Sequence, residues 1–427
     1  MGHNEWKYSY LKIIYLHRCL TKPINLLPVK PILYLQILIL WMLFPAQMLA
    51  SGDTIVASNK FYTQSANIFY QPGMVIGTHS FVKGDNPTNK PISFYQSFTA
   101  QYSIHTDGRK LWQQMYGYPV WGFGMYGAFF PKNTQLGGPI AMYTFFNAPI
   151  KRWEKWCINY EVDFGFAFNW KNHDLLENGY YYPIGSHVTV FFDFGLNSTI
   201  QISKKTDLYF GFHFTHFSNG AVKLPNDGLN MISLRGGIRY VYTDRPEYIT
   251  SDIPEFKKEW EWVVYISPSY KQTGFIYINA NNESVAKAFN YGVFTVSSGI
   301  NRQISYKIKL GGGTDFSYNE AYGADTVMVN GVPEKAPSYF RDKFLIGIFP
   351  SFELVVNKLS LLVQPGVYIY KPKTEVKETP DTYQRVGLRL HLSDHLIAGV
   401  NLRAYNFSKA DFIEFNVGYT LHWYKIP

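Results

Sequence analysis

A histidine and a serine lie two residues apart in the segment THFSNG, at His216 and Ser218. A serine hydroxyl beside an imidazole is the pairing from which many hydrolases build a nucleophile, with the histidine as the base that takes its proton. The spacing is a weak signal by itself, because a chain with 11 histidines is expected to contain such a pair by chance. The face on which the two side chains lie is therefore more informative than their separation.

The strand predicted over residues 206–219 alternates with a period of two residues. Its even positions are apolar as far as Phe214 and then become His216 and Ser218. Successive side chains of a strand point to opposite faces, so the pair shares the apolar face. His213 falls on the opposite face, with the other polar residues. Polar groups on an apolar outer surface are costly, which favours a functional role for the pair.

The next predicted strand, within residues 230–244, places Asn230 on the same apolar face. Neighbouring antiparallel strands bring such side chains close together when their register agrees. The residues between the two strands have the composition of a structured hairpin loop. Around a reacting ester, we expect backbone N–H groups of this loop to stabilise an oxyanion. The residues assigned to the oxyanion or to support of the loop are Asn219, Gly220, Asn226 and Gly228, with the N–H groups around Asn219 and Gly220 as the oxyanion donors.

The elements that position these residues are predicted to be long membrane-spanning strands. The segment 157–170, CINYEVDFGFAFNW, alternates throughout, with Ile158 to Trp170 on an apolar face and Glu161 and Asp163 on a polar one. Such strands exceed the usual globular length of about five or six residues and suit a tilted strand that crosses a bilayer. Aromatic residues make up 18% of the chain. We therefore predict an all-β fold, an antiparallel transmembrane β-barrel with apolar residues facing lipid.

The alternating segments divide the chain into two halves of about eight strands each. The predicted domains are a β-barrel over 51–245, a linker over 246–258 and a second β-rich half over 259–427. Periodicity leaves open whether the halves form one wide barrel or two small ones. The second half is also a possible degenerate duplication of the first, in which Asp315 and Ser317 stand where His216 and Ser218 do.

The N-terminal residues read as an export signal. Basic residues precede an apolar core at about 32–44 and small residues near Ala50, which predicts a cleaved signal peptide over 1–50, with a membrane anchor as the alternative. This segment holds five of the 40 Lys and Arg residues and one of the 31 Asp and Glu residues, so a charge of +5 remains. That balance predicts no nucleic-acid partner. Cys157 would be the one remaining thiol, and no residues have metal-ligand spacing, so we predict no metal and no cofactor.

Around His216 the sequence resembles the lipid A 3-O-deacylase family of outer-membrane barrels, also called acyloxyacyl hydrolases. The family pattern His-x-Ser-Asn followed by Pro-Asn-x-Gly is matched from His216 to Asn219 and from Pro225 to Gly228. The resemblance covers roughly residues 60–245 and implies an eight-stranded barrel in the outer membrane of a Gram-negative bacterium. It further implies a carboxylic ester hydrolase that removes an acyl chain from the lipid A of lipopolysaccharide. The catalytic residues would be Ser218, His216 and the residue at position 230.

One position departs from the family pattern. The family carries a glutamate that orients the histidine, where this chain has Asn230. An amide can fix the imidazole tautomer but cannot stabilise the imidazolium by charge. The alternatives are lower activity, a substitute role for Asp227, or a pseudoenzyme.

Two further classes of function are a channel or hydrophobic-substrate transporter and a purely structural barrel. A transporter predicts decisive polar groups in the lumen, whereas a lipid hydrolase predicts them on the lipid face. The sequence does not predict the oligomeric state.

Overall fold

The computed structural model describes residues 61–131, 134–171, 173, 183–278, 284–373, 380–406 and 409–424. The predicted signal peptide over 1–50 lies outside these residues. Within them, no helix has the length and apolar character needed to cross a membrane.

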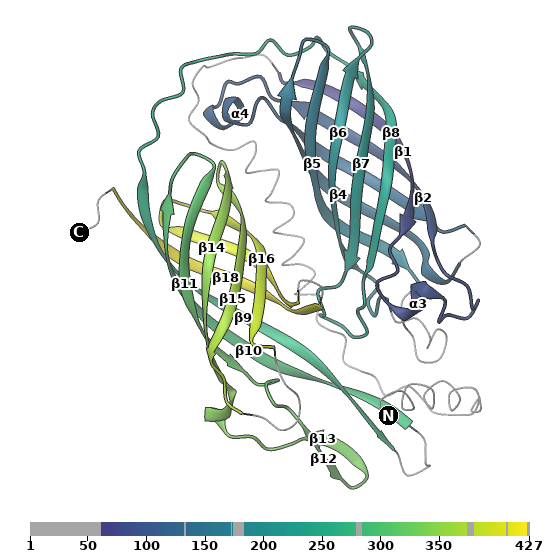
Figure 1. Ribbon diagram of the computed structural model, residues 1–427, viewed down its shortest axis with the longest axis vertical. Coiled ribbons are helices and arrows are strands. Elements are labelled where there is room, and N and C mark those ends of the chain that lie inside the picture. The colour runs from purple at the N-terminus through teal and green to yellow at the C-terminus, as the bar shows by residue number, and fades with distance from the viewer. Residues whose placement is uncertain are drawn as a thin grey trace.

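The chain forms two closed antiparallel barrels of eight strands each, which lie side by side (Figure 1). The prediction of an all-β barrel fold is therefore confirmed. The two halves form two separate small barrels, not one wide barrel. The first barrel closes by pairing of its first strand with its last. Its strands are β1 (Thr63–Val75), β2 (Phe94–His105), β3 (Val120–Phe129), β4 (Gly137–Arg152), β5 (Trp156–Trp170), β6 (Thr189–Gln201), β7 (Thr206–Ser218) and β8 (Leu229–Val241).

The second barrel closes by pairing of β18 with β9. Its strands are β9 (Glu259–Ile278), β10 (Ser284–Gln303), β11 (Ile308–Asn319), β14 (Phe344–Val356), β15 (Leu359–Tyr370), β16 (Thr382–His391), β17 (Leu396–Tyr405) and β18 (Lys409–Trp423). The remaining short elements lie in the connections. They are α3 (Ser80–Lys83), α4 (Leu111–Met115), η2 (Thr134–Leu136), the hairpin of β12 (Thr326–Val329) and β13 (Val332–Lys335), and η3 (Phe340–Lys343).

Both barrels have a short-turn end and a long-loop end. At one end of the first barrel, residues 153–155 and 202–205 form short turns, and residues 106–119 with α4 are the one longer connection there. Residues 76–93 and 219–228 connect strands at the other end. In the second barrel, residues 357–358 form a short turn and residues 320–343 form a long connection that carries the β12–β13 hairpin. β7 is the seventh strand, as predicted, and it ends at the long-loop end.

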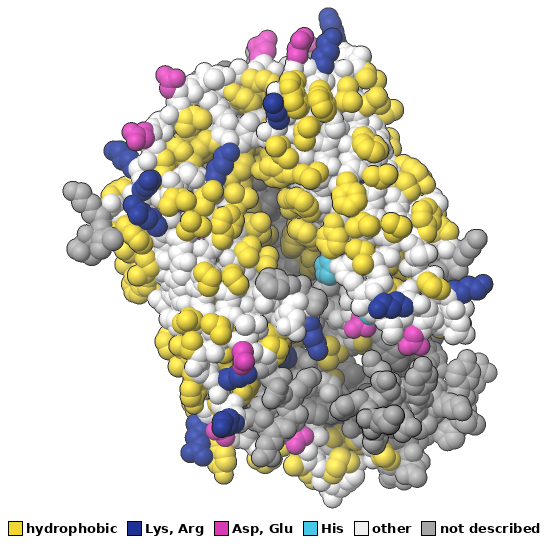
Figure 2. Space-filling view, in the orientation of Figure 1, with side chains coloured by type: hydrophobic (Ala, Val, Ile, Leu, Met, Phe, Trp, Pro, Cys, Tyr) yellow, Lys and Arg dark blue, Asp and Glu magenta, His cyan; other side chains and the backbone are white. Residues whose placement is uncertain are grey.

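The outside of each barrel is apolar and the lumen is polar. In β7 the outward Phe210 is 59% exposed, whereas the inward His213 is fully buried. His213 bonds to Asp193 and Tyr209 in the lumen, as the alternation predicts. Figure 2 shows hydrophobic side chains spread over the surfaces of both barrels. Apolar side chains outside and polar ones inside are typical of a transmembrane barrel.

Buried ion pairs fill the middle of each lumen. In the first barrel Arg235 lies 2.8 Å from Glu161, 3.1 Å from Asp193 and 3.5 Å from Asp163. In the second barrel Arg385 and Arg403 both contact Asp315 and Glu414 at 2.6–3.0 Å. Opposite charges at this separation stabilise one another strongly where water is excluded.

One facing assignment made from the sequence is wrong. Trp170 turns inward instead of outward, because the β4–β5 register shifts beside it and Asn169 has a positive φ of 63°. Asp315 and Ser317 face the lumen, whereas His216 and Ser218 lie on the outward face of β7. The two pairs therefore lie on opposite faces of their strands, and the duplication stays a prediction.

Replacing Arg235 tests the lumen ion cluster. Arg235→Met leaves three buried carboxylates without their shared cation, and we expect the free energy of unfolding to fall by about 3–5 kcal/mol. Urea-induced unfolding in phospholipid vesicles measures the change. The matched control is Arg245→Met, because Arg245 bonds to Asp207 at 2.6 Å but its side chain is 28% exposed. Loss of that pair is expected to cost about 0–1 kcal/mol. Equal losses for the two variants would contradict a structural role for the cluster.

Candidate functional site

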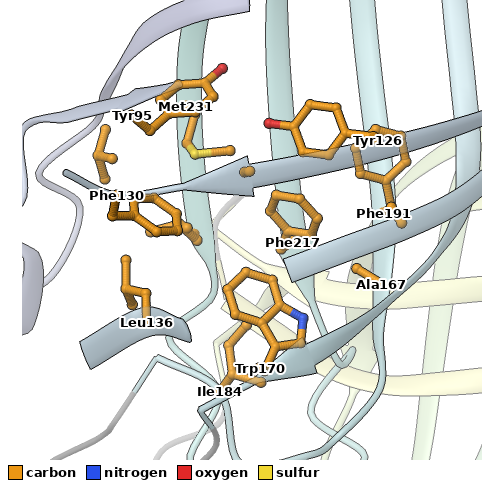
Figure 3. Close-up of a cluster of buried hydrophobic side chains, with 14 of the residues drawn as sticks. Tyr95, Tyr126, Phe130, Leu136, Ala167, Trp170, Ile184, Phe191, Phe217 and Met231 are labelled. Atoms are coloured by element: carbon orange, nitrogen blue, oxygen red, sulfur yellow. The ribbon is translucent and has the colours of Figure 1, made fainter. Parts of the chain in front are cut away.

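An aromatic cluster in the lumen fixes the end of β7. Phe217 is fully buried among Trp170, Phe191 and Tyr126, with ring centroids 4.9, 5.4 and 6.1 Å away (Figure 3). Aromatic contacts of this kind stabilise the fold by more than the burial of their apolar surface alone. Because side chains alternate along a strand, an inward Phe217 forces its two neighbours outward. The cluster therefore sets the direction of His216 and Ser218.

Asn230 orients the imidazole of His216. The two residues are paired across β7 and β8, and His216 Nδ1 lies 2.6 Å from Asn230 Oδ1. An amide oxygen only accepts a hydrogen bond, so the proton is on Nδ1. The unprotonated Nε2 is then free to act as a base. The predicted proximity of these two residues is confirmed.

Ser218 is buried at the start of the loop that follows β7. The backbone N–H of Gly220 donates a hydrogen bond to Ser218 Oγ, with 3.0 Å between the atoms. A Cβ placed on Gly228 would lie 3.4 Å from His216 Cε1 and 3.6 Å from Ser218 Cβ, so both side chains border the same point. Among the described residues, no hydrogen bond joins His216 to Ser218. Catalytic hydrogen bonds often form only once substrate is bound.

The loop over 219–228 is held by its own polar side chains. Asn219 N–H donates to Asn226 Oδ1 at 2.9 Å, and Asn219 Nδ2 donates to Lys223 O at 2.7 Å. Gly220 and Gly228 have φ angles of 64° and 70°, which favour glycine. Gly228 N–H also donates to Pro183 O at 3.0 Å. The four residues predicted to support the site therefore shape this loop.

Two residues with no sequence motif also reach the site. Thr78 Oγ1 lies 3.5 Å from Asn230 Nδ2, a distance at the limit of a hydrogen bond. His79 Nε2 donates to Gly228 O at 3.0 Å. Burial lowers the pKa of His79, and the carboxylate of Asp227 offsets this only in part. The neutral His79 therefore supports the loop, and Asp227 is exposed to solvent.

The surroundings of the pair are apolar. On β6, Val190 is paired with Ser218 and Phe192 with His216, and both side chains lie on the outward face. Among the described residues, no group of three His, Cys, Asp or Glu side chains is placed to hold a metal ion. The site thus combines a hydroxyl, an oriented imidazole and a backbone N–H next to a lipid-facing surface. This set is suited to acyl transfer from an apolar ester.

Solved structures of large barrels are similar to this chain only at a coarse level. CdiB from Acinetobacter baumannii is 8% identical with a TM-score of 0.19, and the match covers 85% of this chain and 60% of that one. The translocator domain of autotransporter NalP from Neisseria meningitidis is 7% identical with a TM-score of 0.22, covering 85% and 89%. The monoaromatic hydrocarbon channel TodX is 9% identical with a TM-score of 0.19, covering 89% and 94%. Similarity this low carries no functional argument.

Family models match both barrels. No curated protein matches the chain. Residues 96–239 match the model of lipid A 3-O-deacylase (PagL), which spans β2 to β8 and includes the candidate site. Residues 258–423 match the model described as the C-terminal domain of acyloxyacyl hydrolase, which spans the second barrel. The two matches together cover well over half of the sequence, and the chain belongs to the lipid A 3-O-deacylase family of outer-membrane β-barrels.

Proposed function

We propose that the protein is an outer-membrane lipid-ester hydrolase that removes an acyl chain from lipid A by a serine–histidine mechanism. The observation that carries this proposal is the outward-facing set of Ser218, His216 and Asn230, inside the region matched by the deacylase model. A membrane lipid reaches such a surface by diffusion within the bilayer. Exported Gram-negative barrels expose their longer loops to the outside, so this set would lie in the leaflet that contains lipopolysaccharide.

The first half of the mechanism acylates the enzyme. Ser218 Oγ attacks the ester carbonyl carbon while His216 Nε2 takes the hydroxyl proton. The carbonyl oxygen becomes an oxyanion, which accepts hydrogen bonds from the N–H groups of the loop that begins at Asn219. The carbon–oxygen bond to the sugar then breaks, and His216 returns the proton to the leaving alkoxide. The acyl chain is left as an ester of Ser218.

The second half releases the fatty acid. His216 takes a proton from a water molecule, and the resulting hydroxide attacks the acyl-enzyme. The bond to Ser218 Oγ breaks, and the serine recovers its proton from His216. Asn230 holds the imidazole in the required tautomer throughout. Because its amide is neutral, it contributes orientation without charge stabilisation of the imidazolium.

A channel function has less support. In the described part of each barrel, the lumen is crossed by fully buried arginines and their carboxylate partners, such as Arg235 and Arg385. These charged groups of the lumen are paired with one another, whereas the polar groups on the lipid face are arranged around the proposed nucleophile.

The Ser218→Ala variant tests the hydrolase proposal. We expect wild-type protein in detergent to release hydroxyacyl chains from purified lipid A, and the variant to be slower by at least about a thousandfold, because it lacks the nucleophile. Mass spectrometry of lipid A measures the loss. The control is Ser198→Ala, since Ser198 is on the outward side of β6 but near the short-turn end and bonds to Trp156. Unchanged lipid A with folded wild-type protein would refute the proposal.

The Asn230→Asp variant tests the role of the amide. An isosteric carboxylate keeps the contact with His216 Nδ1 and adds charge stabilisation of the imidazolium. Hydrogen bonds to charged groups exceed neutral ones by about 1–1.5 kcal/mol, which predicts a kcat about tenfold higher. Asn230→Ala is expected to lose orientation and activity. A slower Asn230→Asp enzyme, with the Asn230→Ala variant unaffected, would show that position 230 does not act on His216.

A further inference from the structure

The second barrel opens into a fork at its long-loop end. β9 and β18 are paired from Trp260 and Trp423 only as far as Ile266 and Val417. Beyond that point β9 continues to Ile278 and pairs with β10, while β18 continues back to Lys409 and pairs with β17. The two strands thus diverge, and an ion pair between Lys271 and Asp411 bridges them. Figure 1 shows β9 and β10 extending beyond the rest of the second barrel.

The loop over 219–228 of the first barrel contacts both branches of this fork. On one branch, Leu224 N–H donates to Gln272 Oε1 at 2.9 Å, and a Cβ on Gly274 would lie 3.9 Å from Leu224 Cδ1. On the other branch, a Cβ on Gly220 would lie 2.7 Å from Ile413 Cδ1 and 3.6 Å from Leu402 Cδ1. Only a residue without a side chain fits such an approach. The second barrel therefore contacts Gly220, whose N–H is the candidate oxyanion donor.

The contacts at the opposite end keep the two barrels together along their length. The hydroxyl of Tyr116 donates to Val355 O at 2.5 Å, and Lys307 lies over the Tyr116 ring at 4.7 Å. Figure 2 shows a furrow between the two barrels with hydrophobic side chains on both sides. The loop over 219–228, which follows Ser218, thus lies where two lipid-facing surfaces meet.

We propose that Leu402 on β17 and Ile413 on β18 form an acyl-chain subsite of the hydrolase and contact the acyl chain next to Ser218. This inference rests on the proposed function. An ester whose carbonyl lies at Ser218 Oγ and beside the Gly220 N–H has its chain close to the Gly220 Cα, which faces these two aliphatic side chains. Aliphatic side chains such as Leu402 and Ile413 offer no hydrogen bond, so the ligand that they bind is an apolar chain. The second barrel would then set which chain length is removed.

Chain-length preference provides the first test. Esters of short and long fatty acids are hydrolysed in parallel by wild type, Ile413→Ala and Leu402→Ala. Each methylene in an apolar pocket discriminates by about tenfold or more, so we expect the ratio of kcat/KM for long over short chains to change by about tenfold. The matched control is Val417→Ala, since Val417 is on the same face of β18 and is 59% exposed. An unchanged ratio in both subsite variants would overturn the subsite.

Photocrosslinking provides a second test that does not require hydrolysis. A 3-hydroxy fatty acid with a diazirine on its chain is added to the Ser218→Ala protein in vesicles, and peptides are mapped by mass spectrometry. We expect peptides that contain Leu402 or Ile413 to be labelled more strongly than the peptide that contains Ile348, on the outward face of β14. Excess unlabelled fatty acid is expected to suppress this labelling. Labelling equal to β14 would overturn the subsite. Specific labelling in a protein that hydrolyses no ester would retain the subsite and refute the proposed function.

Discussion

The position of Phe217 in the lumen is the constraint on which the site depends. A strand offers only two directions for its side chains, so burying one residue determines the direction of both neighbours. Trp170, Phe191 and Tyr126 hold the ring of Phe217, and the hydroxyl and imidazole are therefore presented to lipid. A slip of one residue would bury the candidate nucleophile in the lumen and expose an aromatic ring. The aromatic cluster thus links the packing of the lumen to chemistry on the outer surface.

The lumen and the outer surface serve different purposes. Ion pairs around Arg235 and Arg385 fill the interiors and make each barrel a solid support. The outer surface needs no such pairing, because lipid covers its apolar side chains. At the end of β7 this surface carries an oriented imidazole and a hydroxyl that accepts a backbone N–H, the groups that the proposed acyl transfer uses. Rigid strands hold the imidazole, while the loop supplies the backbone groups.

Much of the fold could be predicted because it follows from local alternation. The eight-strand count of each half, the outward face of His216 and the lumen position of His213 all follow from a period of two. Trp170 could not be placed correctly, because a positive φ at Asn169 reverses the alternation without a change in composition. The face of Asp315 was not predicted, since a resemblance of short segments does not fix which face a residue takes.

The site itself was predictable only in part. The contact between His216 and Asn230 follows from strand register, and the loop residues follow from turn chemistry. Thr78 and His79 belong to the β1–β2 connection, and they lie near Asn230 and Gly228 only because β1 pairs with β8 to close the barrel. The contact between Ile413 and Gly220 is harder still to predict from the sequence, because it joins residues of different barrels that are nearly 200 positions apart in the chain.

The even number of strands has a consequence for how the two barrels cooperate. Each barrel begins and ends at its short-turn end, so the connection between β8 and β9, residues 242–258, never has to pass through the bilayer. The second barrel therefore enters with the same polarity as the first. With one strand fewer in the first barrel, the chain would emerge on the opposite side, and the forked end of the second barrel would face away from the candidate nucleophile Ser218. Strand parity alone thus decides that the two halves meet in one leaflet.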